Sequence, residues 1–195
     1  MRQGLLAWVS GAVVVALVLC VGVGAKTKTT IKHDKAFDFA GKTTWAWHPD
    51  GSGSFKLLQA TGEDPDKLYA RFDPVISGAV EQALAARGLA RAAGAPDFYV
   101  NYYVLIGPGN STQYAGQFLA PTPEWGVIPF VGATTSFEVF EQGSLILDVS
   151  AVSTKSVVWR GVAQAEIDRQ RSEEARDQRL RDAVSELLKR FPPKK

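Results

Sequence analysis

The sequence predicts an α+β domain in which two helices pack on one face of a mostly antiparallel sheet of about five or six strands. Three observations lead to this prediction. Several segments alternate apolar and polar side chains, as strands do, and two longer segments repeat apolar residues at helical spacing. The chain has 195 residues, of which 46% are hydrophobic and 22% charged, and this is typical of a single globular domain.

The composition also excludes several classes of protein. A single cysteine rules out a disulfide framework and a CxxC metal site, and two histidines leave little for a histidine-rich metal centre. A formal net charge of +2 does not indicate a nucleic-acid partner. We therefore expect no metal, no cofactor and no nucleic acid.

Residues 1–25 are predicted to direct export. Arg2 is their only charged residue, and the apolar run after it ends in small residues. Three fates stay open: lipid attachment at Cys20, cleavage after Ala25, or retention as a membrane anchor, since about 20 apolar residues can span a bilayer. Leu19 is larger than the lipoprotein pattern prefers directly before the cysteine. All three fates place the rest of the chain in the cell envelope, either in the periplasm or anchored to a membrane.

The domain is predicted to occupy residues 26–195 and to begin with two short strands. Residues 29–35 and 43–47 have strand character and are separated by a turn that contains Gly and Asp. Residues 48–66 are rich in Asp, Gly, Ser and Pro, and we expect them to form a loop.

The first helix is expected to begin at Asp73. Its carboxylate can accept a hydrogen bond from an unpaired backbone amide, and Pro74 fits the first helical position because its missing N–H costs nothing there. Gly88 should end the helix, since glycine enters the left-handed conformation without strain. One apolar stripe follows the helix: Val75, Ile76, Ala79, Val80, Ala83 and Leu84.

The remaining strands and the second helix follow from the same periodicities. A strand over residues 98–106 is largely apolar on both faces, which indicates a central strand that is covered on each side. In a later strand we expect Trp159 to pack in the core and Arg160 to face the other side, toward solvent. Three strands are predicted in this half of the chain: 137–142, 145–152 and 157–167. A helix over 172–190 should end before Pro192, with its charges on a solvated face.

Residues 107–136 are the segment that the sequence singles out for function. Structureless connections of this length are uncommon, and this one is rich in Gly and Pro. It also carries four large aromatic residues, which we predict to contact an unidentified envelope component: Tyr114, Phe118, Trp125 and Phe130. The alternative is that these side chains fold back as a lid over the sheet.

No residue is predicted to be catalytic. His33 and His48 lack the spacing of a zinc site, and the chain contains no Gly-x-Ser-x-Gly nucleophile motif. Cys20 lies in the export segment and is therefore not a catalytic thiol.

Six short motifs cover nearly the whole chain after the export segment. They are residues 38–47 (DFAGKTTWAW), 83–88 (ALAARG), 96–100 (PDFYV), 143–148 (GSLILD), 157–161 (VVWRG) and 189–193 (KRFPP). In this order they resemble the bacterial envelope family named domain of unknown function 4136, whose members are mostly classed as lipoproteins. The chain departs from the family pattern at Ala151, where members often have Asp, and at Lys155, where they often have Gly. The resemblance implies an envelope location and an α/β domain, and it carries no catalytic residues.

The leading functional prediction is a non-enzymatic bacterial envelope protein that binds or scaffolds another component through residues 107–136. Two alternatives stay open. A hydrolase that acts on envelope material would need a nucleophile and a base within hydrogen-bond reach in a cleft. A small-ligand carrier would need a sizeable apolar pocket between the sheet and the helices.

Overall fold

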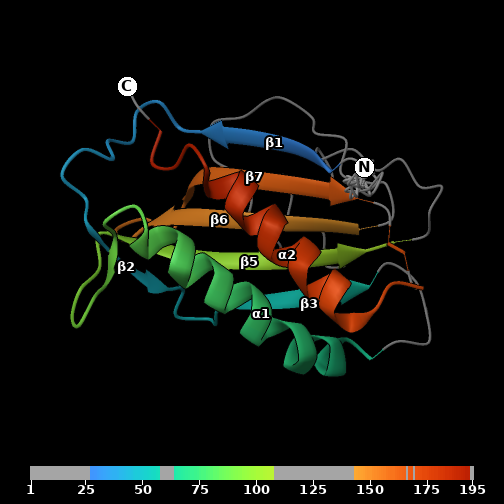
Figure 1. Cartoon of the computed structure of the whole chain (residues 1–195). Coiled ribbons are helices and arrows are strands. Elements are labelled where there is room, and N and C mark those ends of the chain that lie inside the picture. The colour runs from blue at the N-terminus through green and yellow to red at the C-terminus, as the bar shows by residue number, and fades with distance from the viewer. Residues whose placement is uncertain (1–26, 58–63, 108–142, 166, 169, 194–195) are drawn as a thin grey trace, which may run out of the picture.

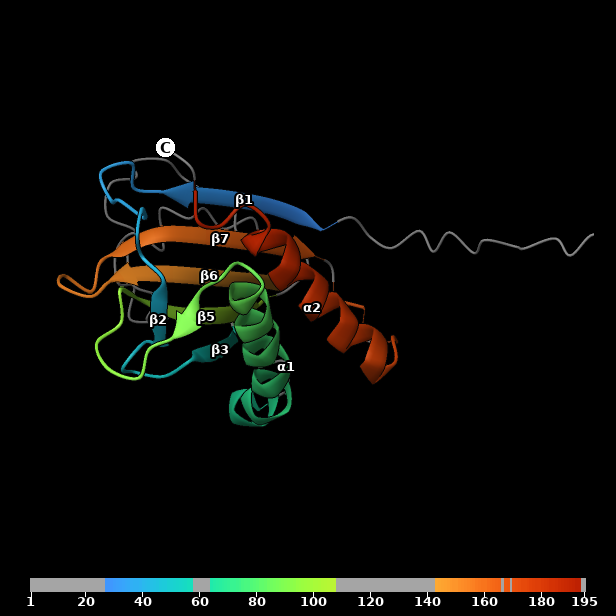
Figure 2. The same cartoon turned by 60° about the vertical axis from the view of Figure 1, so that its left-hand side comes forward.

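The computed structural model describes residues 27–57, 64–107, 143–165, 167–168 and 170–193, and these form two layers. One layer is a sheet and the other consists of two helices that cross the same face of that sheet (Figures 1 and 2). The elements are β1 (Lys28–His33), β2 (Thr44–Trp47), β3 (Gly53–Leu57), α1 (Pro65–Ala85), β4 (Ala90–Arg91), β5 (Phe98–Ile106), β6 (Gly143–Ala151), β7 (Val157–Ala165) and α2 (Glu173–Leu188).

The α+β class is confirmed, but the sheet is mixed and contains seven strands within the described residues. Strands β1, β7, β6 and β5 are antiparallel neighbours, whereas β2 and β3 both run parallel to β5, and β4 runs parallel to β2. The prediction of a mostly antiparallel sheet of five or six strands is therefore wrong in detail. Helix α1 connects β3 to β5 and carries the chain back to the end where β3 began, so that the two strands run in the same direction.

Strand β3 lies inside the region that was predicted to be a loop. It continues the edge that β2 begins, because β2 pairs with the first part of β5 and β3 pairs with the second part. Gly53 opposes Tyr102, and a Cβ atom at this position would lie 2.5 Å from the tyrosine ring. A glycine that would normally indicate a turn is thus required here by a close approach of a buried ring.

Helix α1 begins one Asp-Pro pair earlier than predicted. Asp64 is its N-cap, and the carboxylate of Asp64 accepts a hydrogen bond from the Asp66 amide at 3.0 Å. Pro74 lies within the helix, and the carboxylate of Asp73 accepts hydrogen bonds from Tyr102 Oη and Ser52 Oγ, both at 2.8 Å. Both Asp-Pro pairs have an N-cap residue followed by proline, the combination typical of a helix N-terminus. The apolar contacts of the turns before Asp73 with the core extend the helix to the earlier pair.

The end of α1 and the turn after β6 both use left-handed backbone. Gly88 has a φ of 77°, and the Gly88 amide donates to the Ala85 carbonyl, which confirms the predicted helix stop. Lys155 has a φ of 55°, and its amide donates to the Ala151 carbonyl at 2.8 Å. At Lys155 a lysine therefore adopts the conformation that glycine enters most easily.

The core lies between the helices and the sheet. Trp159 is 1% exposed, as predicted, and its ring lies 5.2 Å from that of Phe191, centroid to centroid. Gly161 lies beneath the same tryptophan, because a Cβ atom there would be 2.7 Å from the indole ring. Val184 and Leu187 of α2 are fully buried in this layer.

Two of the family-like motifs meet at the start of the parallel strands. The Asp97 carboxylate accepts hydrogen bonds from the amides of Thr43 and Thr44, each at 2.9 Å, and from the Thr44 hydroxyl at 2.8 Å. These bonds lower the pKa of Asp97, with the two backbone amides as the largest cause. They fasten the beginning of β2 to the beginning of β5.

The sheet face away from the helices is also buried, which corrects the prediction for Arg160. Arg160 is 4% exposed, and its Nε and Nη2 atoms donate to the two carboxylate oxygens of Asp148, both at 2.7 Å. Burial raises the pKa of the Asp148 carboxyl, and the attraction and hydrogen bonds of Arg160 oppose that shift. The predicted strand over 137–142 lies outside the described residues.

Candidate functional site

A cavity of about 170 Å³ lies between α2 and the end of the sheet formed by β5, β6 and β7. For scale, a cavity of about 150 Å³ lined by aliphatic and aromatic side chains holds a benzene molecule. The cavity is lined by Thr27, Phe55, Phe72, Val104, Ile106, Gly143, Ser144, Leu145, Ala163, Ala165, Ile167, Asp168, Arg171, Arg176, Arg179, Leu180 and Ala183.

Small residues leave the space for this cavity. Gly143 at the start of β6, Ala163 and Ala165 on β7, and Ala183 on α2 each contribute a methyl group or less to the wall. On the other side, the rings of Phe55 and Phe72 stack with their centroids 6.1 Å apart. The result is a gap between layers that elsewhere pack tightly, and most of its lining is apolar.

The lining changes from apolar to charged at the first turns of α2 and in the segment before it. Arg171, Arg176 and Arg179 line the cavity there, and among the described residues they face one acid, Asp168. Arg171 Nε donates to Asp168 Oδ2 at 3.1 Å, and the Gln170 amide also donates to this carboxylate. These bonds, the amide first, lower the pKa of Asp168, so its charge is already matched by Arg171. The Nε atom of Arg176 is buried and has no hydrogen-bond partner within the described residues.

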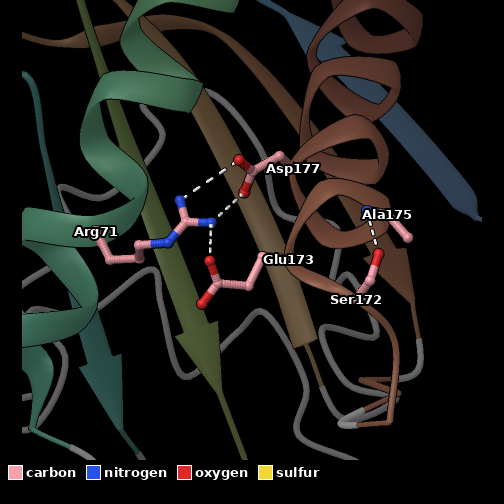
Figure 3. Close-up of polar contacts among 5 residues, drawn as sticks. All are labelled: Arg71, Ser172, Glu173, Ala175 and Asp177. Carbon is pink, nitrogen blue, oxygen red and sulfur yellow. Dashed lines mark hydrogen bonds and ion pairs between the residues drawn. The ribbon is translucent and has the colours of Figure 1, made fainter.

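Two acids of the same turns are bound on the side of α1. Arg71 Nη2 lies 3.0 Å from Asp177 Oδ1 and 3.6 Å from Glu173 Oε2 (Figure 3). The helix itself begins at Ser172, whose hydroxyl accepts a hydrogen bond from the Ala175 amide at 3.3 Å (Figure 3). The start of α2 therefore presents its bound acids to α1 and its arginines to the cavity.

The sequence-predicted contact residues and the lipidation candidate lie outside the described residues: Cys20, Tyr114, Phe118, Trp125 and Phe130. The cavity arginines were not predicted from the sequence, because the charges of this helix were assigned to a solvated face. A signal was present. Arg176 and Arg179 lie four residues before Leu180 and Ala183, so they continue the apolar stripe of α2 toward its N-terminus.

The histidines show no catalytic or metal-binding arrangement in the part of the chain that is described. His33 lies in β1, and in the described ranges no three His, Cys, Asp or Glu residues form a potential metal site. His48 is buried, its Nδ1 atom lies 3.4 Å from Asp50 Oδ2, and its Nε2 atom has no hydrogen-bond partner among described residues.

These features define the class: an α+β domain that holds a largely apolar cavity of about 170 Å³ between its sheet and its helices. The family model described as domain of unknown function (DUF4136) matches residues 29–193. The chain belongs to this family, which confirms the resemblance seen in the six motifs. No curated protein matches the chain. None of the helices in the described ranges is long and apolar enough to cross a membrane.

Solved structures similar to this chain include the following three. A DUF4136 family protein from Bacteroides thetaiotaomicron has a TM-score of 0.50 and 15% identity, with coverage of 85% of this chain and 96% of its own. A PDZ domain protein from Parabacteroides distasonis has a TM-score of 0.47 and 16% identity over 88% of this chain, which spans only 36% of that protein. The PelC dodecamer protein from Paraburkholderia phytofirmans has a TM-score of 0.41 and 11% identity, with coverage of 87% and 100%. At 15% identity, the first similarity shows the fold alone.

Proposed function

We propose that this chain is a non-enzymatic protein of the bacterial cell envelope that binds a small apolar ligand between α2 and the sheet. The cavity carries this proposal. Ligand sites are concave and mostly apolar, with a few polar groups that fix orientation, and the cavity has this composition. It also meets the condition that the sequence analysis set for a small-ligand carrier. A contact surface on residues 107–136 would be a separate property of a segment outside the described residues.

The geometry supports binding over hydrolysis. A hydrolase would need a nucleophile hydrogen-bonded to a base, with the base oriented by a third group. His48 does not have this arrangement: its Nδ1 atom accepts a hydrogen bond from the Asp50 amide at 3.3 Å, and the described residues offer no hydroxyl or thiol within hydrogen-bond distance of its Nε2 atom.

The proposed location places the cavity near a membrane. Thr27 lines the cavity and lies seven residues after Cys20, a span that reaches about 25 Å when fully extended. If residues 1–25 are retained or Cys20 carries a lipid, the cavity stays within this distance of the attachment point. Apolar ligands are concentrated in membranes, so this position suits a protein that binds one.

Deleting residues 2–25 should keep the protein in the cytoplasm, whereas the complete chain should fractionate with the envelope of its native host. Immunoblotting of cell fractions checks this, and recovery of the complete chain as a cytoplasmic protein would refute the proposed export. Mass spectrometry of the N-terminus then separates the three fates. A diacylglycerol-modified Cys20 indicates a lipoprotein, Lys26 as the first residue indicates release, and an intact N-terminus indicates a retained anchor.

Filling the cavity should abolish ligand binding. Ala183→Leu adds three carbon atoms to the α2 wall and occupies part of the cavity. By isothermal titration calorimetry, this variant should bind 1-octanol at least about tenfold more weakly than the original chain does. Ala175→Leu, on the exposed side of the same helix, is the matched control and should bind 1-octanol unchanged. Every variant keeps residues 1–25, so binding to that apolar segment cancels. Equal affinity of the two variants would show that 1-octanol does not occupy the cavity.

A further inference from the structure

We propose that the ligand is a single-chain amphiphile with an anionic head group, and that Arg176 binds this head group. The inference rests on the proposed function of the cavity and adds the chemical class of the ligand. Its basis is the unequal distribution of charge around a largely apolar space, together with one buried guanidinium nitrogen that has no partner within the described residues.

The charges around the cavity favour an anion. Among the described residues, three guanidinium groups and one carboxylate line it, and that carboxylate, Asp168, is bound by Arg171 and attracted by Arg179. Two acids in the first turns of α2, Glu173 and Asp177, are held by Arg71 of α1. A cationic ligand would meet net repulsion here, whereas an anionic ligand would be attracted.

Arg176 has the geometry to bind an anionic head group. Its Nε atom is buried and lacks a hydrogen-bond partner among the residues described, and leaving a buried donor unpaired is costly. The guanidinium group presents several N–H donors in a fixed plane that matches a carboxylate or a phosphate. Because Arg176 lines the cavity, a ligand oxygen there could accept a hydrogen bond from its guanidinium group.

The rest of the wall selects the other end of the ligand. Away from the arginines the cavity is bounded by aliphatic and aromatic groups, such as Val104, Leu145 and Leu180, which offer an alkyl chain contacts but no hydrogen bonds. A volume of about 170 Å³ is close to that of the benzene-binding cavity and accommodates a six-carbon segment. Eight-carbon amphiphiles are therefore suitable probes.

The test measures the affinity of the complete chain for four eight-carbon probes by isothermal titration calorimetry. Octanoate and octyl phosphate should bind about tenfold more tightly than 1-octanol. This factor corresponds to the lower end of the free energies found for hydrogen bonds to charged groups. Octyltrimethylammonium should bind more weakly than 1-octanol. Arg176→Gln should remove the preference for the anions and leave the affinity for 1-octanol unchanged. The matched control is Arg181→Gln, at an exposed position of the same helix, which should keep the preference.

The outcomes separate this inference from the proposed function. If 1-octanol binds and octanoate binds no more tightly, the head-group site is wrong and the apolar cavity stands. If none of the four probes binds, the proposed function itself fails. Equal losses in Arg176→Gln and Arg181→Gln would show a general effect of positive charge and would overturn the role of Arg176. If Arg176→Gln does not fold, Arg176→Lys takes its place, because it retains the charge without the planar group. This variant should bind octanoate more tightly than 1-octanol by a factor between one and about ten. A preference equal to that of the original chain would overturn the inference.

Discussion

Replacing Trp159 by alanine should lower the free energy of unfolding by about 3–5 kcal/mol, the range for emptying a buried aromatic site. The side chain is 1% exposed and contacts Phe191, and Gly161 offers no side chain that could move into the vacated space. Urea denaturation followed by circular dichroism measures the change.

Trp47 provides the matched control for this prediction. It packs against the same core from β2 but is only partly buried, and its Nε1 atom donates to Glu81 at 3.3 Å. Trp47→Ala should therefore cost less than Trp159→Ala, because less apolar surface returns to water on unfolding. If Trp47→Ala lowered the free energy of unfolding as much as Trp159→Ala, or more, the position of Trp159 at the centre of the core would be contradicted.

Removing either member of the Asp148–Arg160 pair alone should lower the free energy of unfolding by about 3–5 kcal/mol, because the remaining buried charge loses two hydrogen bonds and the attraction of an opposite charge. Asp148 is 0% exposed and Arg160 is 4% exposed. The double variant Asp148→Leu with Arg160→Met should lose far less free energy of unfolding than the sum of the two single losses. It removes both charges and keeps most of the side-chain volume. Denaturation of Asp148→Leu, Arg160→Met and the double variant measures the coupling.

The exposed pair Arg91–Glu81 is the control for burial. Its nitrogen and oxygen atoms lie 2.9 Å apart, but the two side chains are 56% and 42% exposed. Arg91→Ala should cost less than about 1 kcal/mol, because solvent screens the lost attraction. Losses of similar size at Arg91 and Arg160 would show that burial does not govern the energy of the Asp148–Arg160 pair.

Much of the fold was predictable because its signals are local. The alternation in β5, β6 and β7 reflects the pleat of a strand, and the apolar stripe from Leu180 to Phe191 reflects the period of a helix. These elements lie within a few residues of their predicted bounds. The position of Trp159 in the core followed from the same alternation.

Other features depended on partners that are distant in the sequence. Two Asp-Pro pairs carry the same helix-start signal, and contacts with the core select Asp64 over Asp73. The parallel direction of β3 follows from the crossover through α1, which a glycine-rich segment does not indicate. Alternation correctly assigned Arg160 to the opposite face from Trp159, but it could not indicate that this second face is buried.

By itself the sequence determined the class of the fold, the family and the identity of most strands and helices, because these depend on side-chain order along one element. The tertiary structure decided the strand directions, the pairing of Asp148 with Arg160 and the cavity beside Arg176. A cavity is a volume that several elements leave unfilled. The sequence of one segment does not show how closely the other elements will pack against that segment. Small residues at 143, 163, 165 and 183 become the walls of one space only when β6, β7 and α2 have packed together.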